Sequence, residues 1–212
     1  MSYFSKNKDF VLLMGGQICS TFADLLFNVS IILFIYSKSS SIASTTFAIV
    51  LSTLSKMLGS FFVTHFLDKI KSKKIIIISW MFKLLFVMIS QFLIRNTLYV
   101  YIFLSAYSFM SSIASPAIGT LLSHLSKGAE LIRQNSIYNL SLQLIQTAAW
   151  GISIPIINFV GTSKILMTII VFYCLSIGFM YYIQRDLSVE NYKADNKTFW
   201  TRFHDGVQAL RE

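Results

Sequence analysis

Charged residues are scarce in this sequence of 212 residues: 13% are Asp, Glu, Lys or Arg, whereas 55% are hydrophobic and 19 are Phe. One soluble core of this length cannot hide so much apolar surface, so lipid must cover the excess. The composition therefore argues against a soluble domain and predicts an all-α integral membrane protein.

Cysteine and proline are also rare, with two residues of each. Cys19 and Cys174 both lie within apolar stretches and form no CxxC pair, so neither a disulfide framework nor a metal site is indicated. Pro116 and Pro155 lie within apolar stretches as well. Each removes one intrahelical hydrogen bond and permits either a static bend or a kink that helps helices rock around a central site.

Motifs of soluble enzymes are missing from the sequence. It contains no G-x-x-x-x-G-K-S/T loop and no G-x-S-x-G turn, and its three histidines show no HExxH spacing. We therefore expect no enzyme activity, no cofactor and no metal. The net charge of +9 would suggest nucleic acid in a soluble protein, but anionic lipids also attract loop lysines. The expected partner is the lipid bilayer and not nucleic acid.

Apolar runs divide the chain into six predicted transmembrane helices, each near the roughly 20 residues that cross a bilayer. They cover residues 10–36, 44–66, 75–94, 98–122, 136–160 and 165–182. Residues 1–183 are thus predicted to form one six-helix bundle, and residues 184–212 a polar tail. The first run is too long for a signal-peptide core and lacks a small-residue cleavage site, so a retained helix is expected.

Basic residues predict the orientation. Of the 18 Lys and Arg residues, 13 lie in the N-terminal head, the second and fourth loops and the tail: Lys6, Lys8, Lys69, Lys71, Lys73, Lys74, Lys127, Arg133, Arg185, Lys193, Lys197, Arg202 and Arg211. The opposite loops hold Lys38, Arg95 and Lys164. Short basic loops stay in the cytoplasm, so both termini are expected there, in a multi-pass protein of the bacterial inner or plasma membrane.

Three charged residues, Asp24, Lys56 and Lys83, fall near the middle of predicted helices. A charge at that depth costs about 2.5 to 3.5 kcal/mol, so it marks an ion pair, a water-filled cavity or a functional site. One interpretation is a structural bridge between Asp24 and Lys56 on adjacent helices. The other is a pathway in which Asp24 titrates. Lys83 could instead pack beside a helix dipole or a hydroxyl group.

Polar residues recur at helical spacing in four of the predicted helices. The stripes are Gln17, Ser20, Asp24 and Asn28 in the first, Ser52, Lys56 and Ser60 in the second, Ser105, Ser108, Ser112, Ser115 and Gly119 in the fourth, and Asn139, Gln143, Gln146 and Trp150 in the fifth. The small residues of the fourth stripe suit either a tight helix contact or a cavity wall. The amides of the fifth stripe would lack partners in lipid, so we expect them to line a cavity.

The loop between the second and third predicted helices resembles the signature loop of the major facilitator superfamily. Asp68, Lys69, Lys73 and Lys74 match its acidic and basic positions, and Thr64 stands where the pattern has Gly. Three stretches resemble the macrolide-efflux and enterobactin-exporter branch: G-G-Q-I-C-S-T-F-A-D (residues 15–24), S-P-A (residues 115–117) and F-H-D-G-V-Q-A-L-R (residues 203–211).

The resemblance implies a proton-driven exporter of an amphipathic small molecule that works by alternating access. Its pathway would be lined by the first, second, fourth and fifth helices, with Tyr107 standing where many members have an arginine. Gly-Pro of the family's fifth-helix antiporter motif is replaced by Ile154-Pro155.

Family members consist of two six-helix halves, so the resemblance also implies a second half or a second copy as partner. The tail resembles the linker before the seventh helix. Its apolar residues Phe199, Phe203, Val207 and Leu210 predict an amphipathic cytoplasmic helix, lying either on the inner membrane face or in water. The alternative function is a membrane interaction protein, such as an immunity or regulatory subunit, that keeps the fold without transport.

Overall fold

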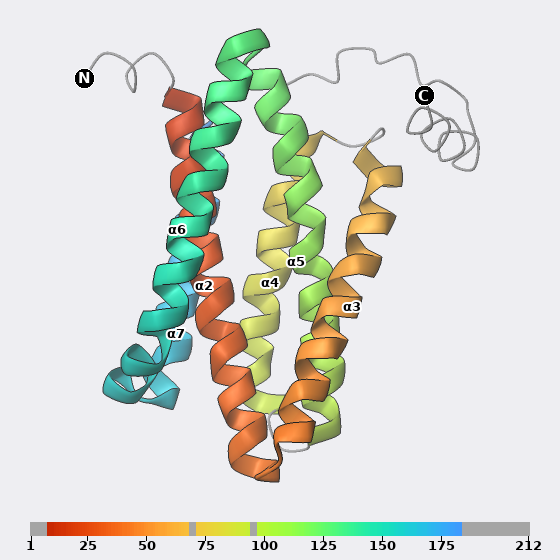
Figure 1. The fold of residues 1–212 in the computed structure, drawn as a ribbon, viewed down its shortest axis with the longest axis vertical. Coiled ribbons are helices and arrows are strands. Elements are labelled where there is room, and N and C mark those ends of the chain that lie inside the picture. Colours follow the sequence, from red (N-terminus) through yellow and green to blue (C-terminus); the bar gives the residue numbers. More distant parts are fainter. Residues whose placement is uncertain (1–7, 68–70, 94–96, 184–212) are drawn as a thin grey trace.

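The computed structural model describes residues 8–67, 71–93 and 97–183, which form a bundle of α-helices (Figure 1). The helices are α2 (Lys8–Ser39), α3 (Ile42–Leu67), α4 (Ser72–Leu93), α5 (Thr97–Leu125), α6 (Gly128–Val160) and α7 (Thr162–Tyr181). Short connections join consecutive helices, so neighbours in sequence run in opposite directions (Figure 1). The predicted all-α fold is confirmed for this part of the chain.

The predicted apolar runs coincide with these helices, each of which begins one to eight residues earlier than predicted and ends within three residues of the predicted end. The largest difference is at α6, which begins at Gly128, eight residues before the predicted span. Its first turns are polar, so hydropathy alone could not locate the start of the helix. Gly128 and Gly161, with φ of 61° and 82°, adopt left-handed conformations where α6 begins and where it meets α7.

Five of the helices are long and apolar enough to cross a membrane: α2, α3, α5, α6 and α7. Helix α4 has 22 residues but carries Lys73, Lys74 and Lys83, which shorten its uninterrupted apolar stretch. It nevertheless packs beside α5 and α7 within the same bundle. The chain is therefore built as a multi-pass membrane protein, and a sixth crossing by α4 stays a prediction.

Helix α2 is the central element, in contact with α3, α5, α6 and α7. Small residues allow its neighbours to approach closely: a Cβ atom on Gly16 would lie 3.2 Å from both the Ser176 carbonyl oxygen and the Trp80 ring. Apolar side chains pack in two clusters along the bundle, one containing Phe27 and Leu104 and the other containing Leu13 and Ile118. This packing fixes the face of α2 that looks into the bundle.

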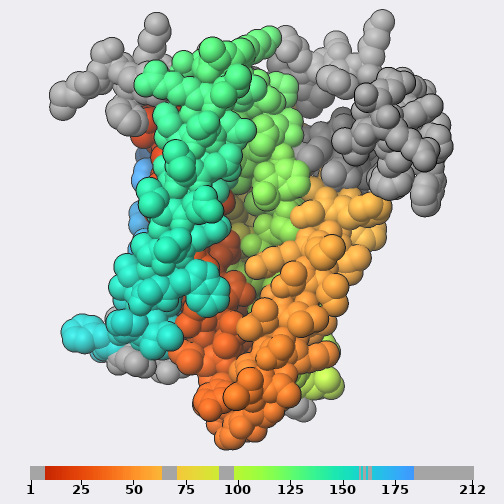
Figure 2. Space-filling model, viewed as in Figure 1, coloured from red at the N-terminus to blue at the C-terminus, as the bar shows by residue number. Residues whose placement is uncertain are grey.

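One face of the bundle combines α2, α3, α5 and α6. Figure 2 shows α6 and α3 at its two sides, with α2 and α5 visible between them. Of the five helices that are long and apolar enough to cross a membrane, α3 and α6 are the least buried: 22% and 17% of their apolar stretches lie inside the bundle. They also carry many of the exposed large apolar side chains, including Met57, Phe61, Leu140 and Leu144. The predicted tail helix, with Phe199, Phe203, Val207 and Leu210, lies outside the described residues.

Candidate functional site

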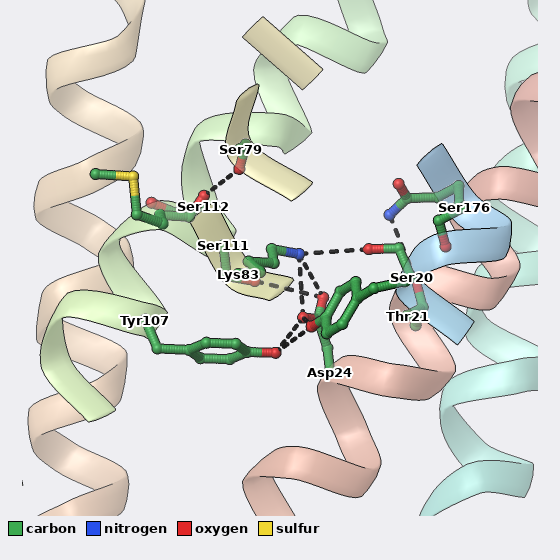
Figure 3. Close-up of polar contacts among 12 residues, drawn as sticks. Ser20, Thr21, Asp24, Ser79, Lys83, Tyr107, Ser111, Ser112 and Ser176 are labelled. Carbon is green, nitrogen blue, oxygen red and sulfur yellow. Dashed lines mark hydrogen bonds and ion pairs between the residues drawn. The ribbon is translucent and has the colours of Figure 1, made fainter. Parts of the chain in front are cut away.

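An ion pair lies near the middle of the bundle, between Asp24 of α2 and Lys83 of α4 (Figure 3). The Lys83 Nζ atom donates to Oδ2 of Asp24 at 2.8 Å and to Oδ1 at 3.0 Å. The Lys83 side chain is 2% exposed and that of Asp24 19%. Two charges removed from water in this way need each other, because either one alone would be buried without compensation.

Two tyrosines and a serine also bind Asp24, and together with Asp24 and Lys83 they form the Asp24 cluster. Tyr107 of α5 and Tyr173 of α7 each donate a hydrogen bond from the phenol group to Oδ1 of Asp24, at 2.5 Å in both cases. Their hydroxyl groups also contact one another. Ser111 of α5 donates to Oδ2 at 3.4 Å. Hydrogen bonds to an ionised acceptor are among the strong ones, and here they join α2 to three other helices.

The lysine is held on its other sides as well. Lys83 Nζ lies 3.4 Å from the Ser20 hydroxyl oxygen and 5.7 Å from the centre of the Tyr173 ring. A cation over an aromatic face is attracted to the ring's negative charge density. The ring of Tyr107 also packs against Phe27, with 4.4 Å between the two ring centres. The cluster is thus a polar group inside the bundle in which Lys83 is buried and Asp24 remains partly exposed.

The ion pair carries no net charge, and removal of either member would leave the other uncompensated in a medium of low dielectric constant. Together with the hydrogen bonds from Tyr107, Tyr173 and Ser111, the pair connects α2 with α4, α5 and α7.

The expected bridge between Asp24 and Lys56 is wrong: the partner of Asp24 is Lys83. Helix α3 packs on α5 through a buried face that includes Ser52, Ser55 and Gly59, and Lys56 stays exposed beside it. Lys83 instead belongs to the buried face of α4, with Ile76, Trp80 and Val87. Adjacency in sequence favoured Lys56, but it is the packing of the helices that selects Lys83.

Two other predicted pathway residues of α2 turn toward their own helix. Asn28 donates to the backbone carbonyl of Asp24 at 2.6 Å, and Gln17 donates to the Thr21 hydroxyl at 3.3 Å. Both side chains are half-buried. Gln17 Oε1 is buried and has no hydrogen-bond partner among the described residues. These residues lie one or two turns from the ion pair but do not bind it.

The predicted pathway residues of α6 are exposed and lie apart from the Asp24 cluster. This group comprises Asn139, Gln143, Gln146 and Trp150. Asn139 donates to the side-chain oxygen of Asn135 at 3.1 Å, one turn earlier on the same helix. Their role as a cavity wall stays a prediction. Tyr107, in contrast, is brought directly onto Asp24.

The sequence pattern did not single out Tyr173 or Ser111. Tyr173 lies in the middle of the apolar helix α7 and is fully buried. A buried phenol group needs a hydrogen-bond partner, so a lone mid-helix tyrosine was the available signal for a polar contact inside the bundle. For Ser111 no such signal existed, because α5 contains other serines at similar depths.

The predicted signature loop is only partly described, since Asp68 and Lys69 lie outside the described residues. Lys73 donates from Nζ to the backbone carbonyl of Ile183 at 2.6 Å, which links the start of α4 to the second residue after the end of α7. Lys74 is exposed. In the described ranges no three His, Cys, Asp or Glu side chains gather as metal ligands would.

The sequence model of the Major Facilitator Superfamily matches residues 13–210. The chain belongs to the major facilitator superfamily. The match covers nearly all of the bundle, including every residue of the Asp24 cluster, so this major facilitator protein is a membrane transporter by family, a class whose members are not enzymes. No curated protein matches the chain.

Proposed function

We propose that this chain is one six-helix half of a secondary active transporter, in which Asp24 is the group that binds and releases the coupling proton. The observation that carries the proposal is the cluster of Asp24 with Lys83, Tyr107 and Tyr173, which joins four helices through one carboxylate. Ionisable groups at mid-membrane depth are costly, and function is the usual reason for keeping them.

Alternating access would follow from the change in charge. With Asp24 ionised, α2 is held to α4, α5 and α7; with Asp24 protonated, that connection weakens and α2 can shift relative to them. The transported molecule is proposed to be a small amphipathic compound moving outward. This part rests on the likeness of residues 15–24, 115–117 and 203–211 to the macrolide-efflux and enterobactin-exporter branch.

A second six-helix body is proposed to cover the face of α2, α3, α5 and α6. That body is either a separate half or a second copy of this chain. The exposed amides Gln143 and Gln146 on α6 support it, because each unpartnered polar group facing lipid costs on the order of one to several kcal/mol. The rest of the outer surface, which is formed by apolar side chains of the spanning helices, would face the bilayer.

The chain expressed alone is not expected to transport. Rocking around a shared site needs two bodies, and the isolated half has nothing to rock against. The test is to purify the chain in mild detergent, measure its mass, and assay efflux of amphipathic drugs from cells that express it alone. A stable monomer that confers proton-dependent efflux would overturn the proposal.

Replacing Asp24 with Asn in the assembled transporter is expected to abolish proton-dependent efflux, and the double variant Asp24→Asn/Lys83→Met, which leaves no uncompensated charge, is expected to accumulate in the membrane and still not to transport. Asn keeps a hydrogen-bond acceptor for Tyr107 and Tyr173 but cannot exchange a proton. The matched control is Asp9→Asn, at an acidic residue in the first turn of α2, which should leave efflux unchanged. Efflux at the native level in the Asp24 variant would exclude Asp24 as the coupling group.

A second candidate function has its own support. The charge of Asp24 is already balanced by Lys83 and its oxygens are bonded to donors inside the bundle, as in a purely structural ion pair. The chain would then be a membrane interaction or regulatory protein that keeps the fold without transport. In that case Asp24→Asn would reduce accumulation and partner binding, and no efflux activity would be there to lose.

Both termini are proposed to be cytoplasmic, in the bacterial inner or plasma membrane. A reporter fused after Lys38, in the last turn of α2, should then be external, and one fused after Lys71, just before α4, should be cytoplasmic. Alkaline phosphatase and green fluorescent protein report the two compartments with opposite signals. An external Lys71 fusion would reverse the proposed orientation.

A further inference from the structure

An apolar groove lies on the outside of the bundle between α3 and α4, away from the Asp24 cluster. Its volume is about 270 Å³, and the described residues that line it include Phe62 and Val63 of α3, Ile78 and Phe82 of α4, and Phe109 and Ile113 of α5. In Figure 1, α5 lies between α4 and α3. Both helices pack along α5 and scarcely touch one another, so α5 forms the floor of the groove.

The groove is separate from the proposed proton site. Tyr107 and Ser111 of α5 bind Asp24, whereas Phe109 of the same helix lines the groove. Phe109 is two residues from each of them, and two residues turn an α-helix by about 200°. The groove therefore opens on the opposite side of α5 and belongs to the surface that faces outward from the bundle.

The length of the groove along α4 is less than the hydrocarbon thickness of one leaflet of a bilayer, so the groove fits within one leaflet. On α4 it runs from Ile75, in the first turn, to Phe82. Seven residues of α-helix rise about 10 Å, against roughly 15 Å for the hydrocarbon of one leaflet. Its walls expose large apolar side chains, with Ile78 49%, Phe82 43% and Phe62 55% exposed. An extended acyl chain, apolar along its whole length, is the chemistry that fits.

A positive charge lies at one end of the groove. Lys74 is exposed and precedes Ile78 and Phe82 by four and eight residues, so the three share one face of α4. The half-buried Lys71 is one turn before Ile75. From this charge and this depth we infer that the groove holds one acyl chain of an anionic phospholipid of the cytoplasmic leaflet, with its phosphate group beside Lys74.

Native mass spectrometry of the purified chain tests this site with phosphatidylglycerol as the probe. One molecule should survive the activation energy that removes loosely attached lipids, and phosphatidylcholine should not. Lys74→Gln should lower phosphatidylglycerol retention about fivefold, the effect of one lysine near an anionic lipid surface. Ile78→Trp, which fills the groove, should abolish retention.

Matched controls lie at the other end and on another face of the bundle. Lys164→Gln removes an exposed lysine near the start of α7, and Met167→Trp enlarges a side chain that is 66% exposed. Neither should change retention, and all variants should elute as monodisperse species, which shows that they are folded. Equal retention of both lipids, or no change in Lys74→Gln, would overturn the inference. So would a dimer that Ile78→Trp dissociates, because the groove would then hold a second copy.

Discussion

Lys83→Met is expected to destabilise the bundle by about 3 to 5 kcal/mol, the usual cost of removing one member of a buried ion pair. The lysine is 2% exposed, so water cannot replace it beside Asp24. Denaturant titration in detergent, followed by circular dichroism, measures the loss. The double variant Asp24→Asn/Lys83→Met should recover most of the stability, because it leaves no uncompensated charge.

The control for this experiment is Lys56→Met, since Lys56 is also a lysine in an apolar helix but is exposed. It should cause no loss of stability, because it removes an exposed charge from an apolar helix. Equal losses for the two lysines would show that the pairing of Asp24 with Lys83 does not hold the bundle together. Additive losses in the double variant would show that the two residues are not coupled.

Gly59→Ala is expected to separate α3 from α5 and to cost about 1 to 3 kcal/mol. A Cβ atom at Gly59 would meet the Ser112 hydroxyl group and would lie 2.5 Å from the Phe109 backbone carbonyl oxygen. A side chain can rotate away, but the carbonyl oxygen is fixed within α5. Thermal unfolding in detergent is the measurement, and Gly59→Ala/Ser112→Ala should recover only part of the loss.

Gly151→Ala on α6 provides the comparison, because nothing lies within 4 Å of an added Cβ atom there. Alanine is the better helix former by about 1 kcal/mol, so this variant should be as stable as the native chain or more so. The two glycine substitutions are therefore expected to have opposite signs. A stabilised Gly59→Ala variant would contradict the close approach of α3 and α5.

The sequence predicted the helices well because long apolar runs carry their own signal. It also identified Asp24 and Lys83 as unusual, since charges stand out against apolar neighbours. It could not pair them correctly, because hydropathy and spacing define a face within one helix but not which helix it meets. Gly59 shows the reason: the approach of α3 to α5 depends on a missing side chain, and that approach leaves Lys56 outside.

Tyrosines were harder to place than charges. Tyr107 was noted only through the family resemblance, and Tyr173 was missed, although both bind Asp24. A tyrosine suits a membrane interface, a packed core or a polar cluster equally well, so its type says little before its neighbours are known. The amides of α6 formed a clearer pattern in the sequence than the tyrosines did, yet the described bundle leaves these amides exposed.

Two side-chain contacts, at different heights along the bundle, join α4 to α7 and the residues that follow it. Lys73 bonds to the carbonyl oxygen of Ile183, and Lys83 lies over the ring of Tyr173, so the two contacts are ten residues apart on both helices, about 15 Å. Two contacts with the same spacing on both helices fix the register of this antiparallel pair. The pair can tilt as one piece, but neither helix can slide along the other unless both contacts break.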